Sequence, residues 1–212
     1  PCPSCTTAPV GARVGVRVVT QNQSAVAFGL MRYFQDEGSA INASLAYGGK
    51  VINYDGQNNC TIGGQVLVPV GDNSYTTILG WMNNQESWPN DKELRADGAT
   101  PLAGALATAL DHYKTVIIPG DLSRSCRGKY VLVITDGEET CGGDPTAAAA
   151  ALRVVNVGGA NYDVKTFVVG FGAGLAGSAS LDAMARAGGT SVNDLGNPDP
   201  AGHALYSTDV AT

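Results

Sequence analysis

The chain has 212 residues, which is enough to bury one substantial core and predicts a single domain over residues 1–212. It carries 13 basic and 19 acidic residues, a formal net charge of −6, so no global positive field favours nucleic acid or an anionic membrane surface. No apolar stretch reaches the length of a bilayer span, so we expect no membrane insertion.

The first half of the chain has mixed signals. Residues 12–20 (ARVGVRVVT) are rich in valine and predict a buried strand, and residues 25–34 predict a strand or a short helix. Residues 35–63 show no sustained period and predict an irregular insertion. Residues 64–71 (GQVLVPVG) predict a strand that its proline confines to an edge, and residues 72–85 predict a helix.

Strands and helices alternate in the second half. Thr100 and Pro101 have the types expected at the N-cap and first position of a helix. Strands are predicted over residues 129–135 and 164–172, and helices over residues 100–113, 144–155 and 178–189. This alternation predicts an α/β fold, a mostly parallel sheet with helices on both faces. Such sheets bind ligands at the carboxyl ends of their strands.

This topology is expected to place two side chains with oxygen atoms close together, and both are candidate metal ligands. Asp136 comes directly after the apolar strand YVLVIT, and Thr100 opens a neighbouring helix. A carboxylate and a hydroxyl can converge on one hard divalent cation, which prefers oxygen ligands and retains water. The alternative is that Thr100 is only an N-cap and Asp136 only a turn residue before Gly137.

Four motifs stand in a recognisable order along residues 98–190: GATPLAGAL, YVLVITDGEET, VKTFVVGFG and LDAMARAGGT. Together they resemble a von Willebrand factor type A domain, which implies a Rossmann-like three-layer fold. Residues 12–20 (ARVGVRVVT) resemble the second strand of that family, so the resemblance covers residue 12 to about residue 189. The resemblance also implies a metal-ion-dependent adhesion site (MIDAS) for Mg²⁺ or Ca²⁺, built from a D-x-S-x-S loop, a threonine and an aspartate. Thr100 and Asp136 match the last two. No D-x-S-x-S loop precedes Ala12, so the chain starts after that loop or this copy lacks it.

A narrower resemblance comes from an LVP strand, an I-L-x-W helix, a TPL helix and a cysteine before YVLVIT. These are similar to the amino-terminal domain of the PilY-type proteins of type IV pili. Residues 204–209 (ALYSTD) resemble the closing strand of such domains, which makes residues 190–203 a loop insertion. The propeller and calcium loop of that family are absent, so we expect a domain truncated at both ends.

The resemblance implies a non-enzymatic adhesion or pilus-assembly module, exported to the cell surface or pilus tip. Its partners would be pilus subunits such as minor pilins, or a protein or host ligand with an acidic group. One alternative is a metal-free structural domain of the pilus tip.

A second alternative is a dinucleotide-binding enzyme. GAGLAG contains Gly172, Gly174 and Gly177 in a G-x-G-x-x-G pattern, and Asp194 follows at about the distance of a ribose-binding acid. However, Gly177 precedes the cap of the next helix instead of lying inside it.

Catalytic groups are otherwise scarce. The two histidines, His112 and His203, stand in no recognisable catalytic motif, and the adjacent Glu138 and Glu139 are expected to form a solvated turn. The letters of a D-x-S-x-S loop do occur in DLSRS, residues 121–125, but after the threonine motif, so we interpret this segment as a surface turn.

Five cysteines in a chain of low charge are typical of an exported protein, and their odd number leaves one without a partner in this chain. Cys2 and Cys5 form a CPSC pair without a second metal-binding pair at zinc-finger spacing, so structural disulfides are expected. Cys126 and Cys141 flank the strand before Asp136, and a disulfide between them would require one loop to fold back.

Overall fold

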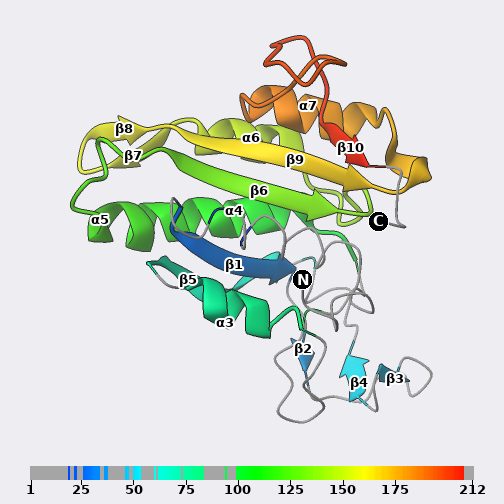
Figure 1. The fold of residues 1–212 in the computed structure, drawn as a ribbon, viewed down its shortest axis with the longest axis horizontal. Coiled ribbons are helices and arrows are strands. Elements are labelled where there is room, and N and C mark those ends of the chain that lie inside the picture. Colours follow the sequence, from blue (N-terminus) through cyan, green and yellow to red (C-terminus); the bar gives the residue numbers. More distant parts are fainter. Residues whose placement is uncertain are drawn as a thin grey trace. The chain divides into compact units, whose positions relative to one another are not determined.

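The computed structural model describes residues 19, 22, 26–33, 36–37, 46–47, 50–53, 60, 62–72, 74–83, 94 and 99–207 (Figure 1). The chain divides into two compact units, residues 1–99 and 100–212. The prediction of one domain over the whole chain stays a prediction.

The first unit contains an antiparallel pair of strands, β1 (Phe28–Tyr33) and β5 (Gly64–Gly71). Their register is irregular near Phe28 and Leu30. The helix α3 (Tyr75–Gly80) follows, shorter than the predicted residues 72–85. Buried Val19, Val68, Ile78 and Met82 form the core of this unit.

Two expectations for the first unit need correction. Val19 is helical, where a strand was predicted over residues 12–20; it packs in the core with Ile78 and Met82, and tertiary packing overrides the β preference of valine. Most of residues 12–20 lie outside the described residues. Residues 35–63 are not irregular throughout, because they contain the short antiparallel strands β2 (Asp36–Glu37), β3 (Ala46–Tyr47) and β4 (Lys50–Asn53).

The second unit contains a parallel three-stranded sheet in the order β10, β9, β6. The strands are β6 (Lys129–Thr135), β9 (Val164–Phe171) and β10 (Leu205–Ser207). Side chains alternate along β9, where Val164, Thr166 and Val168 are buried. The fold is therefore a mixed α/β fold with a parallel sheet, as the alternation predicted, and it is compatible with a Rossmann-like arrangement.

Three helices accompany this sheet: α4 (Leu102–His112), α6 (Pro145–Leu152) and α7 (Ala179–Ala187). Helices α6 and α7 contact β9 and each other, and α4 contacts α6. In Figure 1 helix α6 lies behind β9. The opposite face exposes Tyr130 and Leu132 of β6, so a helical layer on that second face stays a prediction.

Local capping explains where two of these helices begin. The Asp144 side chain accepts a hydrogen bond from Ala147 N at the start of α6 (2.9 Å), and Ser178 caps α7. Helix α4 does not end at Tyr113 as predicted; it continues through the π-helical turn η3 (Tyr113–Ile117) and α5 (Ile118–Gly120). Tyr113 Oη donates to the Tyr130 carbonyl (2.7 Å) and so joins this helical run to β6.

A β-hairpin, β7 (Val155–Val157) and β8 (Ala160–Tyr162), precedes β9 and was not predicted. After β9 comes the short 3-10 helix η4 (Ala173–Leu175). The loop predicted over residues 190–203 is held by an isolated bridge between Val192 and His203, and β10 then pairs with β9 as the predicted closing strand. Among the described residues, no helix combines the length and apolar character needed to cross a bilayer.

Candidate metal centre

The carboxyl end of β6 brings Thr100 next to the Thr135-Asp136-Gly137 turn. A Cβ added at Gly137 would lie 3.0 Å from Thr100 Oγ1, so a larger residue here would crowd the Thr100 hydroxyl. Inside the turn, the buried Thr135 hydroxyl donates to the Gly137 carbonyl (2.8 Å). Thr100 N donates to Thr140 Oγ1 (2.7 Å), and Thr140 N donates to Thr100 O (3.1 Å). The two segments that carry the predicted metal ligands are therefore joined directly.

The three carboxylates of this loop have different environments. Glu139 accepts hydrogen bonds from Ala103 N (2.7 Å) and Cys141 N (2.8 Å). Glu138 accepts a hydrogen bond from Ser178 Oγ. Asp136 is exposed and has no hydrogen bond or ion pair with any residue that the structure describes. Asp136 is thus the carboxylate of this loop whose oxygens remain available to a ligand.

Two predictions about this loop were wrong. Thr100 does not cap α4: Pro101 occupies the N-cap position without a side-chain cap, and Glu139 satisfies the N–H of Ala103 instead. The Thr100 hydroxyl also has no hydrogen-bond partner in the described part of the chain. The prediction of a solvated turn is wrong for Glu139, which is half-buried and accepts a hydrogen bond from Ala103 N. Glu138 is exposed, as that prediction requires, although Ser178 Oγ donates a hydrogen bond to it. No local sequence signal indicates these contacts, since Ala103 and Ser178 lie 36 and 40 residues away.

The donors at this end of the sheet fit a hard cation in kind, although they supply only part of a coordination shell. Thr100 and Asp136 offer a hydroxyl and a carboxylate, the oxygen ligands that Mg²⁺ and Ca²⁺ prefer. Among the described residues there is no group of three or more His, Cys, Asp or Glu side chains that could hold a metal ion. A site at Thr100 and Asp136 would therefore need further oxygens from water, a partner or other protein residues.

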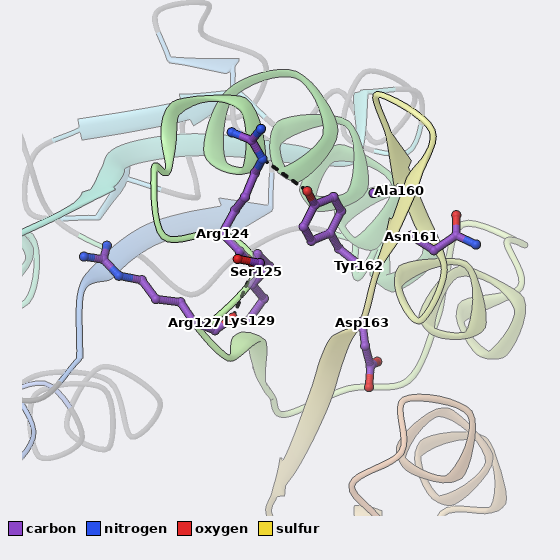
Figure 2. A pocket seen from close by; sticks show the side chains of 8 residues that line it. All are labelled: Arg124, Ser125, Arg127, Lys129, Ala160, Asn161, Tyr162 and Asp163. Carbon is purple, nitrogen blue, oxygen red and sulfur yellow. Dashed lines mark hydrogen bonds between the residues drawn. The ribbon is translucent and has the colours of Figure 1, made fainter.

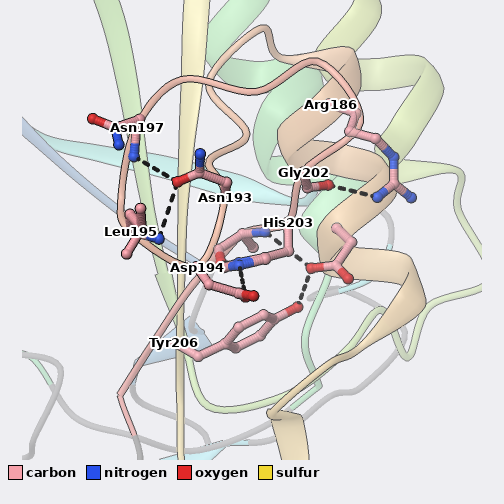
Figure 3. Close-up of polar contacts among 10 residues, drawn as sticks. Arg186, Asn193, Asp194, Leu195, Asn197, Gly202, His203 and Tyr206 are labelled. Atoms are coloured by element: carbon pink, nitrogen blue, oxygen red, sulfur yellow. Dashed lines mark hydrogen bonds and ion pairs between the residues drawn. The ribbon is translucent and has the colours of Figure 1, made fainter.

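A second polar network lies beside this site, around β10 and the start of α7 (Figure 3). Tyr206 Oη lies 2.6 Å from Asp182 Oδ1 and 3.0 Å from the Ser178 carbonyl. Burial and the neighbouring Asp182 raise the pKa of Tyr206. Because Ser178 also donates to Glu138, this network links the loop after β6 to α7 and β10.

The histidine of the 190–203 loop belongs to the same network and shows no catalytic arrangement. His203 Nδ1 lies 2.6 Å from the Ala204 carbonyl, and Nε2 lies 3.2 Å from Asp194 Oδ1. The hydrogen bond to Ala204, together with Asp194, raises the pKa of His203. The imidazole is stacked with the Tyr206 ring, with 6.2 Å between the ring centroids, and in Figure 3 the Asp194 carboxylate lies on the Tyr206 side of the imidazole. Both ring nitrogens are engaged, which favours a structural role for this residue.

The structure also describes the glycine motif of the dinucleotide-binding alternative and the DLSRS segment. Gly172 and Gly177 have positive φ angles of 98° and 74°, and Gly177 directly precedes the N-cap Ser178, as expected. Asp194, the expected ribose-binding acid, faces His203. The DLSRS segment is a turn, as predicted: Asp121 Oδ1 accepts a hydrogen bond from Ser123 N (2.8 Å). It lies before the amino end of β6, whereas Asp136 follows its carboxyl end.

The state of the cysteines differs from the prediction for one disulfide. Cys126 is free and exposed, so the hypothetical disulfide between Cys126 and Cys141 is wrong. The two residues flank opposite ends of the extended strand β6, which separates them too far for an S–S bond. Cys60 and Cys141 are both disulfide-bonded, as the expectation of structural disulfides requires. Cys2 and Cys5 lie outside the described residues.

These features define the second unit as an α/β domain with a polar loop cluster at the carboxyl end of a parallel sheet. No protein-family profile matches the chain. It is similar to two uncharacterized proteins of Bacillus subtilis (strain 168). YwmD is 42% identical over 79 residues, covering 34% of this chain and 32% of YwmD. YwmC is 32% identical over 107 residues, covering 50% of this chain and 41% of YwmC. The matches thus span about a third to two fifths of these relatives' lengths.

Proposed function

We propose that this chain is a von Willebrand factor A-like adhesion or assembly domain that binds an acidic partner through a divalent cation at Thr100 and Asp136. The proposal rests on which side chains at the carboxyl end of β6 have hydrogen-bond partners and which have none. The Thr100 hydroxyl and the Asp136 carboxylate have no partner in the described part of the chain, whereas Glu138 and Glu139 are both engaged.

The chemistry of the site follows from these two donors. When bound, Mg²⁺ or Ca²⁺ supplies the positive charge that attracts a carboxylate of the partner. Asp136 provides one negative charge and Thr100 a neutral oxygen, so the two residues leave that positive charge incompletely neutralised. Glu138 and Glu139 keep the loop in place through Ser178 and Ala103. None of these residues is assigned a catalytic role.

The proposed setting is extracellular, at a bacterial surface or the tip of a type IV pilus, with pilus subunits or an acidic host ligand as partners. The sequence resemblance to the PilY-type proteins supports this setting. The disulfide-bonded state of Cys60 and Cys141 is consistent with an oxidising compartment.

The direct test is thermal unfolding of the protein with and without Mg²⁺ or Ca²⁺. Binding to the folded state alone raises the unfolding midpoint by mass action, and we expect Asp136→Asn to abolish that rise. Asp111→Asn is the matched control, because it removes one exposed carboxylate from α4, away from the loop, and we expect the rise to persist.

Adhesion itself is tested by the binding of an immobilised polyglutamate peptide. We expect binding with Ca²⁺ or Mg²⁺ and its loss on chelation. If the melting curve and peptide binding are the same with and without chelator, the metal-dependent proposal is wrong and a metal-free structural domain becomes the better account. Saturable binding of NAD or FAD would instead favour the dinucleotide-binding alternative at Gly172.

A further inference from the structure

A pocket of about 370 Å³ opens at the amino end of β6, at the opposite end of the strand from Asp136. Its lining comes from the loop before β6 and from the β7–β8 hairpin, and it includes Arg124, Ser125, Arg127, Lys129, Tyr162 and Asp163 (Figure 2). Basic side chains outnumber acidic ones here, although the whole chain has a formal net charge of −6.

Lys129 is a buried cation in this pocket, and no carboxylate of the described residues forms an ion pair with it. The residue is 7% exposed. Its ammonium donates to the carbonyls of Arg124 and Arg127, the latter at 2.9 Å, and lies 5.2 Å from the centre of the Tyr162 ring. Two of its three N–H donors therefore bond to backbone carbonyls, and its charge has no counter-ion in the part of the chain that the structure describes. Buried charges are normally paired, so this one indicates a place for an anion.

Arg124 also lines this pocket. Its Nε donates to Tyr162 Oη (3.1 Å), and in Figure 2 the two side chains point toward each other. This bond engages Nε of the exposed side chain and leaves the N–H groups of its two terminal nitrogens without a partner among the described residues. Two parallel N–H groups in one plane match two oxygens of one oxyanion.

The acidic residue of the lining does not neutralise the pocket. Asp163 is engaged by Arg153, whose Nη2 lies 3.1 Å from Asp163 Oδ2 and whose Nε contacts the other oxygen. In Figure 2 the Asp163 carboxylate points away from Tyr162. Arg127 is 60% exposed and lies 3.5 Å from Asp121, so it contributes a weaker, screened charge at the rim. The charges of Lys129 and Arg124 therefore remain uncompensated.

We propose that this pocket binds a phosphate or sulfate group, with Arg124 as the direct ligand and Lys129 as the buried counter-charge. Two fixed positive charges favour a doubly charged tetrahedral oxyanion over a single carboxylate. The negative net charge of the chain disfavours a long polyanion such as nucleic acid, so the group is a free ion or part of a small ligand.

The test is a titration of the intact protein with inorganic phosphate, inorganic sulfate and acetate at constant ionic strength and neutral pH. Backbone amide resonances of residues 124–129 and 160–163 report the binding by NMR. We expect saturable shifts confined to these residues with phosphate or sulfate, and at least about tenfold weaker binding of acetate. Whichever of phosphate and sulfate binds more tightly identifies the group that the pocket accepts.

The decisive variant is Arg124→Gln, which we expect to weaken phosphate binding by about tenfold or more. Lys114→Gln is the control, because it removes an equal charge from an exposed side chain outside the pocket, and we expect binding within about twofold of the parent. The proposal is overturned if the parent shows no saturable shifts, or if both variants bind phosphate equally well. Binding here should persist in the presence of a chelator, which separates this site from the proposed metal site.

Discussion

The two ends of strand β6 carry opposite charges, and each end combines one charge that is held by the fold with one that is available. At the amino end, Lys129 is buried and bonded to two carbonyls, whereas the terminal nitrogens of Arg124 lack partners among the described residues. At the carboxyl end, Glu139 is bonded to two backbone N–H groups, whereas Asp136 is exposed and unengaged in the described part of the chain.

Whether a charged residue is bonded within the fold, and not the sign of its charge, determines what its replacement should change. A held residue is bonded to backbone groups of a distant or neighbouring segment, so its replacement leaves those groups without a partner and lowers stability. An available residue has no such bonds, so its replacement should change ligand binding and leave stability nearly unchanged. Substitutions at the two ends of β6 test whether its charged residues divide in this way.

The largest expected effect is that of Lys129→Met. It removes the donor to the carbonyls of Arg124 and Arg127, and each unsatisfied carbonyl costs about 1–3 kcal/mol. We expect the free energy of unfolding, measured by urea denaturation, to fall by roughly 2–4 kcal/mol. Lys165→Met is the matched control, since Lys165 is exposed on β9 opposite Tyr130 and should change stability by less than about 0.5 kcal/mol. If both variants lost the same free energy of unfolding, the hydrogen bonds of Lys129 would not stabilise the fold.

The next largest effect is the dependence of stability on pH that Tyr113 causes. Burial raises the pKa of Tyr113 to about 12, whereas its unfolded value is about 10. The unfolded state therefore loses its proton first, so this contribution to stability is complete below about pH 10 and disappears as the pH rises to about 12. Over that range wild-type protein should lose roughly 2–3 kcal/mol more than Tyr113→Phe. Urea denaturation at several alkaline pH values measures the difference, and parallel pH profiles would exclude Tyr113 as its source.

The sequence predicted the elements whose signals are local. The apolar run of residues 129–135 and the caps Asp144 and Ser178 lie where the structure has β6 and the starts of α6 and α7. The β7–β8 hairpin, which the sequence analysis does not predict, also has a local signal. Gly158 and Gly159 form a two-residue turn with φ angles of 60° and 83°, the pair that a tight hairpin prefers. The predicted helix was instead extended to residue 155.

The site could be predicted only in its topology. The parallel arrangement and the family motifs indicated that Thr100 and Asp136 lie in neighbouring loops, and Thr100 indeed contacts Gly137. The bonds of Glu139 to Ala103 and of Glu138 to Ser178 depend on how distant segments meet, so neither periodicity nor capping rules could reveal them. The same limitation applies to the buried Lys129, because lysine at the start of a strand is ordinarily expected at the surface.

The smallest expected change in stability distinguishes Glu139 from Asp136 at the carboxyl end of β6. Glu139→Gln keeps the size of the side chain but replaces one accepting oxygen by an NH₂ group, so one of the bonds to Ala103 N and Cys141 N is lost and the other loses its charge. Because Ala103 N lies in the first turn of α4, the favourable interaction of a carboxylate with that helix end is lost as well. We expect a loss of about 1–2 kcal/mol in the free energy of unfolding without divalent ions. Asp136→Asn removes the same charge three residues away and should cost less than about 0.5 kcal/mol under those conditions, since no described group depends on it. If Asp136→Asn lowered the free energy of unfolding as much as Glu139→Gln in metal-free buffer, Asp136 would be bonded within the fold. The proposal that its carboxylate is available to a cation would then be wrong.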